Sequence, residues 1–168
     1  MNLSELYNTL YNLNSNFKLE YSKEFEFSSP TFMKRIKNPK GLRPYESKYY
    51  IHLATRHINQ ILKPCKNTFK DSGPTIATVL LENNPHFYVF KKMVEAPRQF
   101  QELACKECKW AYSSFIRIKN TGFANLSPAE ETALYKTYVN TCSWVYGDII
   151  FIVNHMNINT ELYSPVVL

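Results

Sequence analysis

Aspartate is scarce in this sequence, with Asp71 and Asp148 as its two copies. Metal-dependent cleavage of phosphodiesters usually needs several clustered carboxylates, so the sequence argues against that chemistry. Glycine is scarce too, and the four glycines form neither a dinucleotide-binding GxGxxG fingerprint nor a P-loop. The GxSxG motif of many serine hydrolases is also absent. The sequence therefore offers no catalytic residues, favours a binding protein over an enzyme without excluding one, and predicts no cofactor.

Long apolar runs and an export signal are missing as well. The longest uninterrupted apolar run covers residues 149–153, whereas a bilayer crossing takes roughly 18 apolar residues or more. The first residues carry neither the basic nor the apolar part of a secretory signal. These absences predict a cytoplasmic protein with no membrane partner, located in the host cytoplasm or the virion if the source is a virus.

The four cysteines show no paired spacing of the kind that disulfide frameworks have, so free thiols in a reducing compartment are expected. Cys105 and Cys108 do have the C-x-x-C spacing of zinc sites, and Cys65 and Cys142 would complete a four-thiolate set. The pair, however, falls inside a predicted helix, on its apolar face, where a reduced cysteine behaves as a small hydrophobe. Buried thiols are the favoured interpretation, and a zinc site is the alternative.

Positive charge is what the sequence has in excess, and it is concentrated in one segment. Residues 34–70 hold ten lysines and arginines against a single acid, Glu46, so this segment alone is +9 while the whole chain is +6. Such a concentration marks where a polyanion or an acidic protein surface would dock. The residues predicted to contact nucleic acid are Lys34, Arg35, Lys37, Lys40 and Arg43 in a basic loop over 28–44, and Lys48, Arg56 and Lys63 on a following helix.

In the first part of the chain, apolar spacing predicts a helix over 3–15 and a strand or short hairpin over 17–27, where aromatic and leucine residues fall on odd positions. Prolines, a glycine and the lack of acids predict the loop over 28–44. Pro44 then begins a helix that runs to Lys63. On its polar face five residues form a narrow ridge: Lys48, His52, Arg56, Asn59 and Lys63.

In the second part, residues 75–91 favour a hairpin, with a helix starting at Asn84 and Pro85 as the alternative. Pro97 is taken as the start of a helix that reaches Ile118. The tetrad Ser127–Pro128–Ala129–Glu130 predicts another helix start, because the serine can cap the helix and the glutamate can bond back to it. That helix is expected to end near Tyr146, with Gly147 as its stop, and residues 149–153 to form a central strand.

Together these elements predict an α+β fold of about four main helices packed with a small, mostly antiparallel sheet. The length of 168 residues suits a single compact domain spanning 1–168, with the basic loop at 28–44.

The abundance of lysine, asparagine, tyrosine and isoleucine is typical of AT-rich coding, as in a phage, a virus or an AT-rich bacterial genome, and favours viral classes of function. The leading hypothesis is a non-enzymatic protein whose basic loop and ridge neutralise nucleic-acid phosphates without reading bases. Tyr45, Tyr49 and Tyr50 are candidates for base stacking, although the last two also fit the apolar face of their helix. A second hypothesis is a structural or assembly component, in which the basic arm and the apolar C-terminal residues 162–168 contact other subunits. A third is an inhibitor that presents its basic face to a host nucleic-acid enzyme.

Overall fold

Helices are the only regular elements in the part of the chain that the computed structural model describes, which is residues 2–38, 40, 42–65 and 84–162. The α-helices are α1 (Leu3–Tyr11), α2 (Leu13–Glu24), α3 (Ser29–Lys37), α4 (Pro44–Leu62), α6 (Pro85–Glu107), α7 (Tyr112–Asn120) and α8 (Pro128–Leu162). A short 3₁₀ helix, Lys63–Cys65, follows α4. None of the described helices combines the length and the apolar content that a membrane crossing would require.

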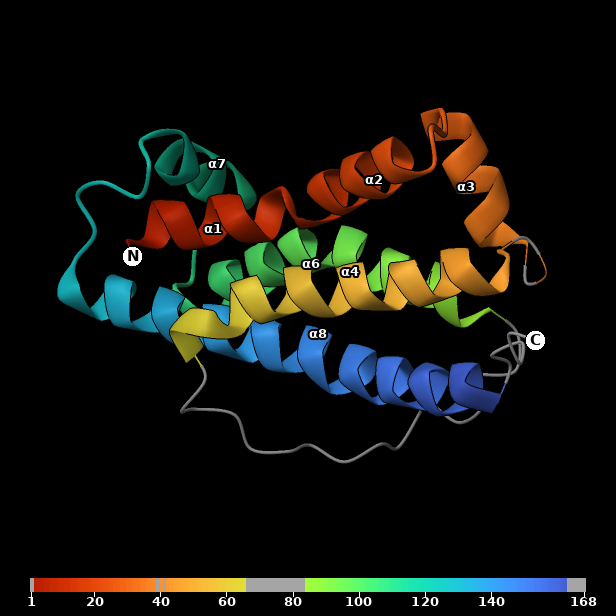
Figure 1. Cartoon of the computed structure of the whole chain (residues 1–168). Coiled ribbons are helices and arrows are strands. Elements are labelled where there is room, and N and C mark those ends of the chain that lie inside the picture. The colour runs from red at the N-terminus through yellow and green to blue at the C-terminus, as the bar shows by residue number, and fades with distance from the viewer. Residues whose placement is uncertain (1, 39, 41, 66–83, 163–168) are drawn as a thin grey trace.

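Helices α4 and α6 form the middle of the bundle (Figure 1). The long helix α8 packs against both of them on one side, and α1 and α2 follow one another along the opposite side. Helix α3 lies across the end of the bundle where α4 begins, and contacts α2 and α6. This arrangement places the lysine-rich helix α3 and the first turn of α4 at the same end of the molecule.

The core beneath that end is aromatic. Phe17 of α2 is fully buried and packs edge to face against Tyr50 of α4, with ring centroids 4.8 Å apart. Phe32 of α3 and Phe90 of α6 meet in the same way at 5.2 Å. Edge-to-face pairs of this kind add to the free energy gained by removing the rings from water. The aromatic core thus holds four helices at fixed positions under the basic segment.

The predicted α+β fold is wrong, because the described residues contain no strand. Residues 17–24, predicted as part of a strand or hairpin, belong to α2. Phe17 and Tyr21 fall on odd positions, as a strand requires, but they are also four residues apart, as a helix face requires. Leu19 separates the two patterns: a strand would bury it beside Phe17, and it is 70% exposed.

The predicted loop over 28–44 is also wrong over most of its length, because residues 29–37 form α3. The Oγ of Ser28 caps this helix by accepting a hydrogen bond from the backbone N–H of Thr31. Pro30 lies in the first turn, where the missing N–H of proline costs no intrahelical bond. Phe32 and Ile36, one turn apart, are fully buried and attach α3 to the bundle.

The predicted helix start at Pro97 is also wrong, because Pro97 lies inside α6. Met93, Ala96, Phe100 and Ala104 are buried along one face of α6, and this packing outweighs the hydrogen bond that Pro97 cannot make. Helix α6 begins at Pro85 instead, capped by Asn84, so the hairpin favoured for 75–91 is wrong from residue 85 on. Residues 75–83 lie outside the described part of the chain.

The helix predicted to reach Ile118 ends at Glu107 instead. Lys109 then adopts a left-handed backbone conformation, and a separate helix, α7, begins at Tyr112. Further on, the predicted start at Ser127 is confirmed, with the N–H and the hydroxyl of Ser127 both donating to Glu130 Oε2. The predicted end near Tyr146 is wrong, since α8 continues through Gly147 to Leu162 and includes residues 149–153. Of the C-terminal segment 162–168, residues 163–168 lie outside the described part.

Two helices of the first half follow the sequence pattern closely. The helix predicted from Pro44 to Lys63 is confirmed as α4, Pro44–Leu62. The helix predicted over 3–15 is found as α1 and the start of α2, which are separated at Asn12.

Truncation of Phe17 and of Leu19 distinguishes the helix from the strand that the sequence pattern also allows. In α2, Phe17→Ala removes a buried ring and is expected to lower the free energy of unfolding by about 3–5 kcal/mol. Leu19→Ala removes an exposed side chain and is expected to change it by less than about 0.5 kcal/mol. Chemical denaturation measures both, and similar large losses in the two variants would contradict the helix.

Candidate nucleic-acid interface

The eight predicted contact residues come from α3, from the turn that follows it and from α4. Helix α3 carries Lys34, Arg35 and Lys37 in its last turn. Lys40 and Arg43 lie in the turn before Pro44, and Lys48, Arg56 and Lys63 follow along α4 or just after it. Seven of these side chains are exposed to solvent, and Arg35 is half-buried. The structure therefore places six of these eight cations on helices, and leaves Lys40 and Arg43 in the turn between α3 and α4.

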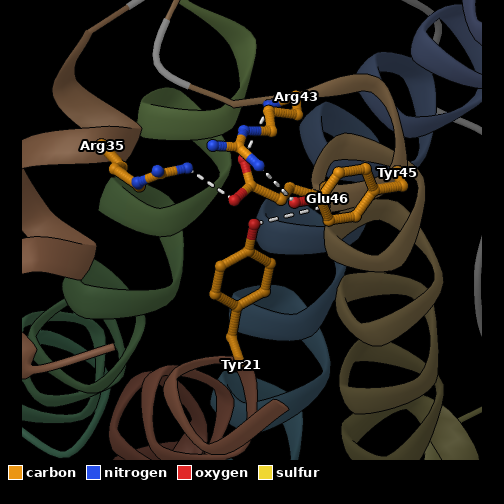
Figure 2. Close-up of polar contacts among 5 residues, drawn as sticks. All are labelled: Tyr21, Arg35, Arg43, Tyr45 and Glu46. Carbon is orange, nitrogen blue, oxygen red and sulfur yellow. Dashed lines mark hydrogen bonds and ion pairs between the residues drawn. The ribbon is translucent and has the colours of Figure 1, made fainter. Parts of the chain in front are cut away.

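Glu46, the one acid of the basic segment, is buried at the centre of this region, with only 2% of its surface exposed. Figure 2 shows its carboxylate between two donors: Arg35 Nη1 bonds to Oε1 at 2.5 Å, and the backbone N–H of Arg43 bonds to Oε2 at 2.7 Å. The second bond closes the start of α4, because the carboxylate reaches back to the residue before the first helical turn. One carboxylate thereby joins the C-terminal turn of α3 to the N-terminus of α4.

Tyr21 connects α2 to the same point. Its hydroxyl donates to the backbone carbonyl of Glu46 at 3.2 Å, and burial raises the pKa of this phenol well above its ordinary value (Figure 2). The guanidinium of Arg35 lies 4.6 Å from the ring centre of Phe27, in the turn between α2 and α3. Arg35 is therefore directed inward, and its charge is neutralised by Glu46 rather than offered to a ligand.

The remaining cations of α3 and of the start of α4 point outward. We call Lys34, Lys37, Lys40, Arg43 and Lys48 the basic end. Within the described part of the chain, none of these five side chains makes an ion pair with a carboxylate. Lys37 lies 5.8 Å from the ring centre of Phe87, and Arg43 Nη1 donates to the hydroxyl of Tyr45 at 3.1 Å. Both contacts hold a cation near an aromatic ring without cancelling its charge.

The ridge along α4 is less uniformly positive than the sequence suggests. Its five members, Lys48, His52, Arg56, Asn59 and Lys63, are all exposed, as predicted. A shallow groove of about 430 Å³ runs beside them, and its lining includes His52, Arg56 and Lys63. Arg56, however, forms an ion pair with Glu20 of α2, and this hydrogen bond lowers the pKa of the Glu20 carboxyl.

The other carboxylate oxygen of Glu20, Oε2, lies 3.0 Å from His57 Nε2. Glu20 therefore contacts two consecutive residues of α4. The structure therefore divides the eight predicted residues. Five form the basic end, Arg35 and Arg56 neutralise glutamates, and Lys63 lies fifteen residues after Lys48, about 22 Å along the helix axis.

Sequence reasoning also left out a contact between Ser47 of α4 and His86 of α6. The Oγ of Ser47 lies 2.8 Å from His86 Nε2, and the hydroxyl of Tyr50 donates to the backbone carbonyl of His86 at 2.6 Å. Burial lowers the pKa of His86 to about 4, so the ring is neutral at neutral pH and too weak a base for efficient proton transfer there. The pair acts as a structural clamp between α4 and α6. Thirty-nine residues separate its members, and no local pattern in the sequence indicates it.

The three cysteines whose side chains the structure describes do not converge. Cys105 and Cys108 are half-buried at the end of α6, and burial raises the pKa of both thiols. Cys142 is buried in α8, about 18 Å along the helix from Glu130, and Glu130 is the residue of α8 that lies near Cys108. The side chain of Cys65 lies outside what the structure describes. Among the described residues, no three potential metal ligands gather at one point.

Comparison with known protein families, with curated proteins and with solved structures finds no match to this chain. The function is therefore inferred from the surface and its chemistry alone.

Neutralising Glu46 tests its role in joining α3 to the start of α4. Glu46→Gln keeps the shape of the side chain but removes the charge that Arg35 bonds to, and it is expected to lower the free energy of unfolding by about 1–3 kcal/mol. Glu24→Gln, at an exposed position of α2, is the matched control and is expected to change it by less than about 0.5 kcal/mol. Equal stability of the two variants in urea would contradict the role given to Glu46.

His86 gives the protein a pH-dependent stability. Its pKa is about 4 in the folded state and about 6.5 in the unfolded chain, so on acidification the unfolded chain takes up the proton first. The stabilisation is fully present above about pH 6.5 and is lost between there and about pH 4, by up to roughly 3 kcal/mol. Denaturant titrations at pH 7, 5.5 and 4.5 are expected to show this loss in the wild type and in His52→Gln, an exposed control, but not in His86→Gln. A parallel decline in all three proteins would assign the effect to other groups.

Proposed function

We propose that this protein binds the phosphate backbone of nucleic acid through the basic end and does so without catalysis. The observation that carries the proposal is the arrangement of the five cations of the basic end, which face solvent with no carboxylate partner in the described part of the chain. Binding to phosphate oxygens releases condensed counterions, so clustered lysines and arginines favour association with any nucleic acid regardless of sequence.

Rigidity supports the proposal. Lys34 and Lys37 are three residues apart on the outer face of α3, and the bond between Arg35 and Glu46 ties that helix to the start of α4. Cations that are already positioned lose less conformational freedom on binding than cations on a flexible loop. Arg35 is a positioning residue in this scheme, since its own charge is directed at Glu46.

The other side of α4 limits the extent of the surface. Glu20 neutralises Arg56 on the α2 side of the ridge, and Glu24 of α2 is exposed near Tyr49. The negative charge of an exposed carboxylate such as Glu24 repels a phosphate backbone. The proposed contact therefore covers α3, the following turn and the first turns of α4, rather than the whole ridge.

Fluorescence polarisation with labelled DNA and RNA tests the proposal. The test variant replaces Lys34, Lys40, Arg43 and Lys48 with serine, and the control variant replaces Lys23, Lys106, Arg117 and Lys136, also three exposed lysines and one exposed arginine. Wild-type affinity is expected to fall about a hundredfold or more between low and moderate salt. The test variant is expected to bind weakly, with the slope of log K against log salt reduced by about 3.

The control variant is expected to retain the wild-type slope and most of the affinity. Binding that is insensitive to salt would contradict the proposal, and so would equal losses in the two variants, because these would indicate an effect of overall net charge. No binding of any nucleic acid at low salt would also contradict it, and would direct attention to an acidic protein surface as the partner of the basic end.

A further inference from the structure

Tyr45 is the most exposed aromatic side chain at the basic end. It is 55% exposed at the second position of α4, whereas Tyr49 is half-buried and Tyr50 is fully buried. Of the three tyrosines that the sequence offers for stacking, the structure therefore leaves Tyr45 with the largest open surface. An exposed tyrosine is ordinary by itself. Its position among the cations is what distinguishes this one.

The ring of Tyr45 is held in place from two sides. Its hydroxyl accepts a hydrogen bond from Arg43 Nη1 at 3.1 Å (Figure 2). Its ring centre lies 5.9 Å from that of Phe25. Phe25 in turn packs on the buried Tyr21, with centroids 4.9 Å apart. A ring supported in this way keeps its orientation when a flat ligand stacks on it, so little side-chain freedom is lost on binding.

Cations flank the ring along the chain. Arg43 precedes Tyr45 by two residues and Lys48 follows it by three, and both are exposed. Alternation of positive charges with a stacking ring is the arrangement by which proteins hold single strands: the cations follow the phosphates and the ring accepts a base face. In a duplex the base faces are covered by their neighbours, so the ring has nothing to stack on.

We propose that the basic end prefers single-stranded to double-stranded nucleic acid, because one unpaired base stacks on Tyr45 while Arg43 and Lys48 bind the flanking phosphates. This inference rests on the proposed function and specifies its substrate class. Cations alone would favour the duplex, whose charge density is higher. The preference for a single strand is therefore a consequence of the ring and not of the charge.

The test compares a labelled single-stranded oligonucleotide with its duplex at two salt concentrations. Tyr45→Leu removes the ring and is expected to weaken single-strand binding roughly fivefold to a hundredfold while changing duplex binding less than about twofold. The salt slope is expected to stay unchanged, because no phosphate contact is lost. Tyr45→Phe keeps the ring and is expected to bind single strands within about threefold of the wild type. Tyr112→Leu, at a 64% exposed tyrosine of α7, is the matched control and is expected to bind like the wild type.

Equal weakening of single-strand and duplex binding by Tyr45→Leu would overturn the inference, and so would wild-type affinity in that variant. In both cases salt-dependent binding by the wild type would leave the proposed function standing. Failure of the wild type to bind either nucleic acid at low salt would instead remove the proposed function itself, so the two failures are distinguishable.

Discussion

The position of the basic surface depends on one buried carboxylate. Glu46 receives Arg35 from α3 and the N–H of Arg43 from the start of its own helix, while its backbone carbonyl receives Tyr21 from α2. A buried carboxylate is stable only when charged or polar donors surround it, and here one donor comes from α3 and the other from the residue before α4. The same requirement therefore ties the last turn of α3 to the start of α4, while the lysines of both elements face solvent. Because Glu46 is buried against Arg35, the basic end keeps its five cations without a carboxylate partner in the described part of the chain.

The sequence predicted the elements whose signals are local. Pro44 with its long apolar face predicted α4, and Ser127 with Glu130 predicted the start of α8, because capping and helical spacing act within a few residues. The α+β fold was wrong where two periods coincide, as in Phe17 and Tyr21, or where packing overrides a local breaker. Pro97 and Gly147 are such breakers: Pro97 lies between buried turns of α6, and Gly147 follows the buried Cys142 and Val145 within α8. No single-residue propensity of a few kcal/mol decides an element with that much buried surface.

The candidate site was predictable as composition and not as geometry. The excess of lysine and arginine over 34–70 predicted a positive surface, but counting charges cannot show that Arg35 and Arg56 face glutamates while Lys34 and Lys48 face solvent. Glu46 itself carried a readable signal, since it follows Arg43 and Pro44 at the spacing of a capping residue. The contact of Arg56 with Glu20 carried none, because it joins residues thirty-six positions apart.

Replacing the expected flexible arm with helix α3 changes how the protein would bind. A flexible lysine-rich loop gains its contacts by ordering itself on the ligand, and the loss of chain entropy offsets much of the electrostatic gain. Helix α3, attached through Phe32 and Ile36 and through Arg35, is ordered before any ligand arrives. Its cations then have fixed spacings, and a fixed spacing favours ligands whose charges match it. A ring held at a fixed point among those cations, as Tyr45 is by Arg43 and Phe25, adds a second condition that charge alone does not impose. Rigidity, which the sequence pattern concealed, is thus the property that would allow a surface without base-specific contacts to distinguish one form of nucleic acid from another.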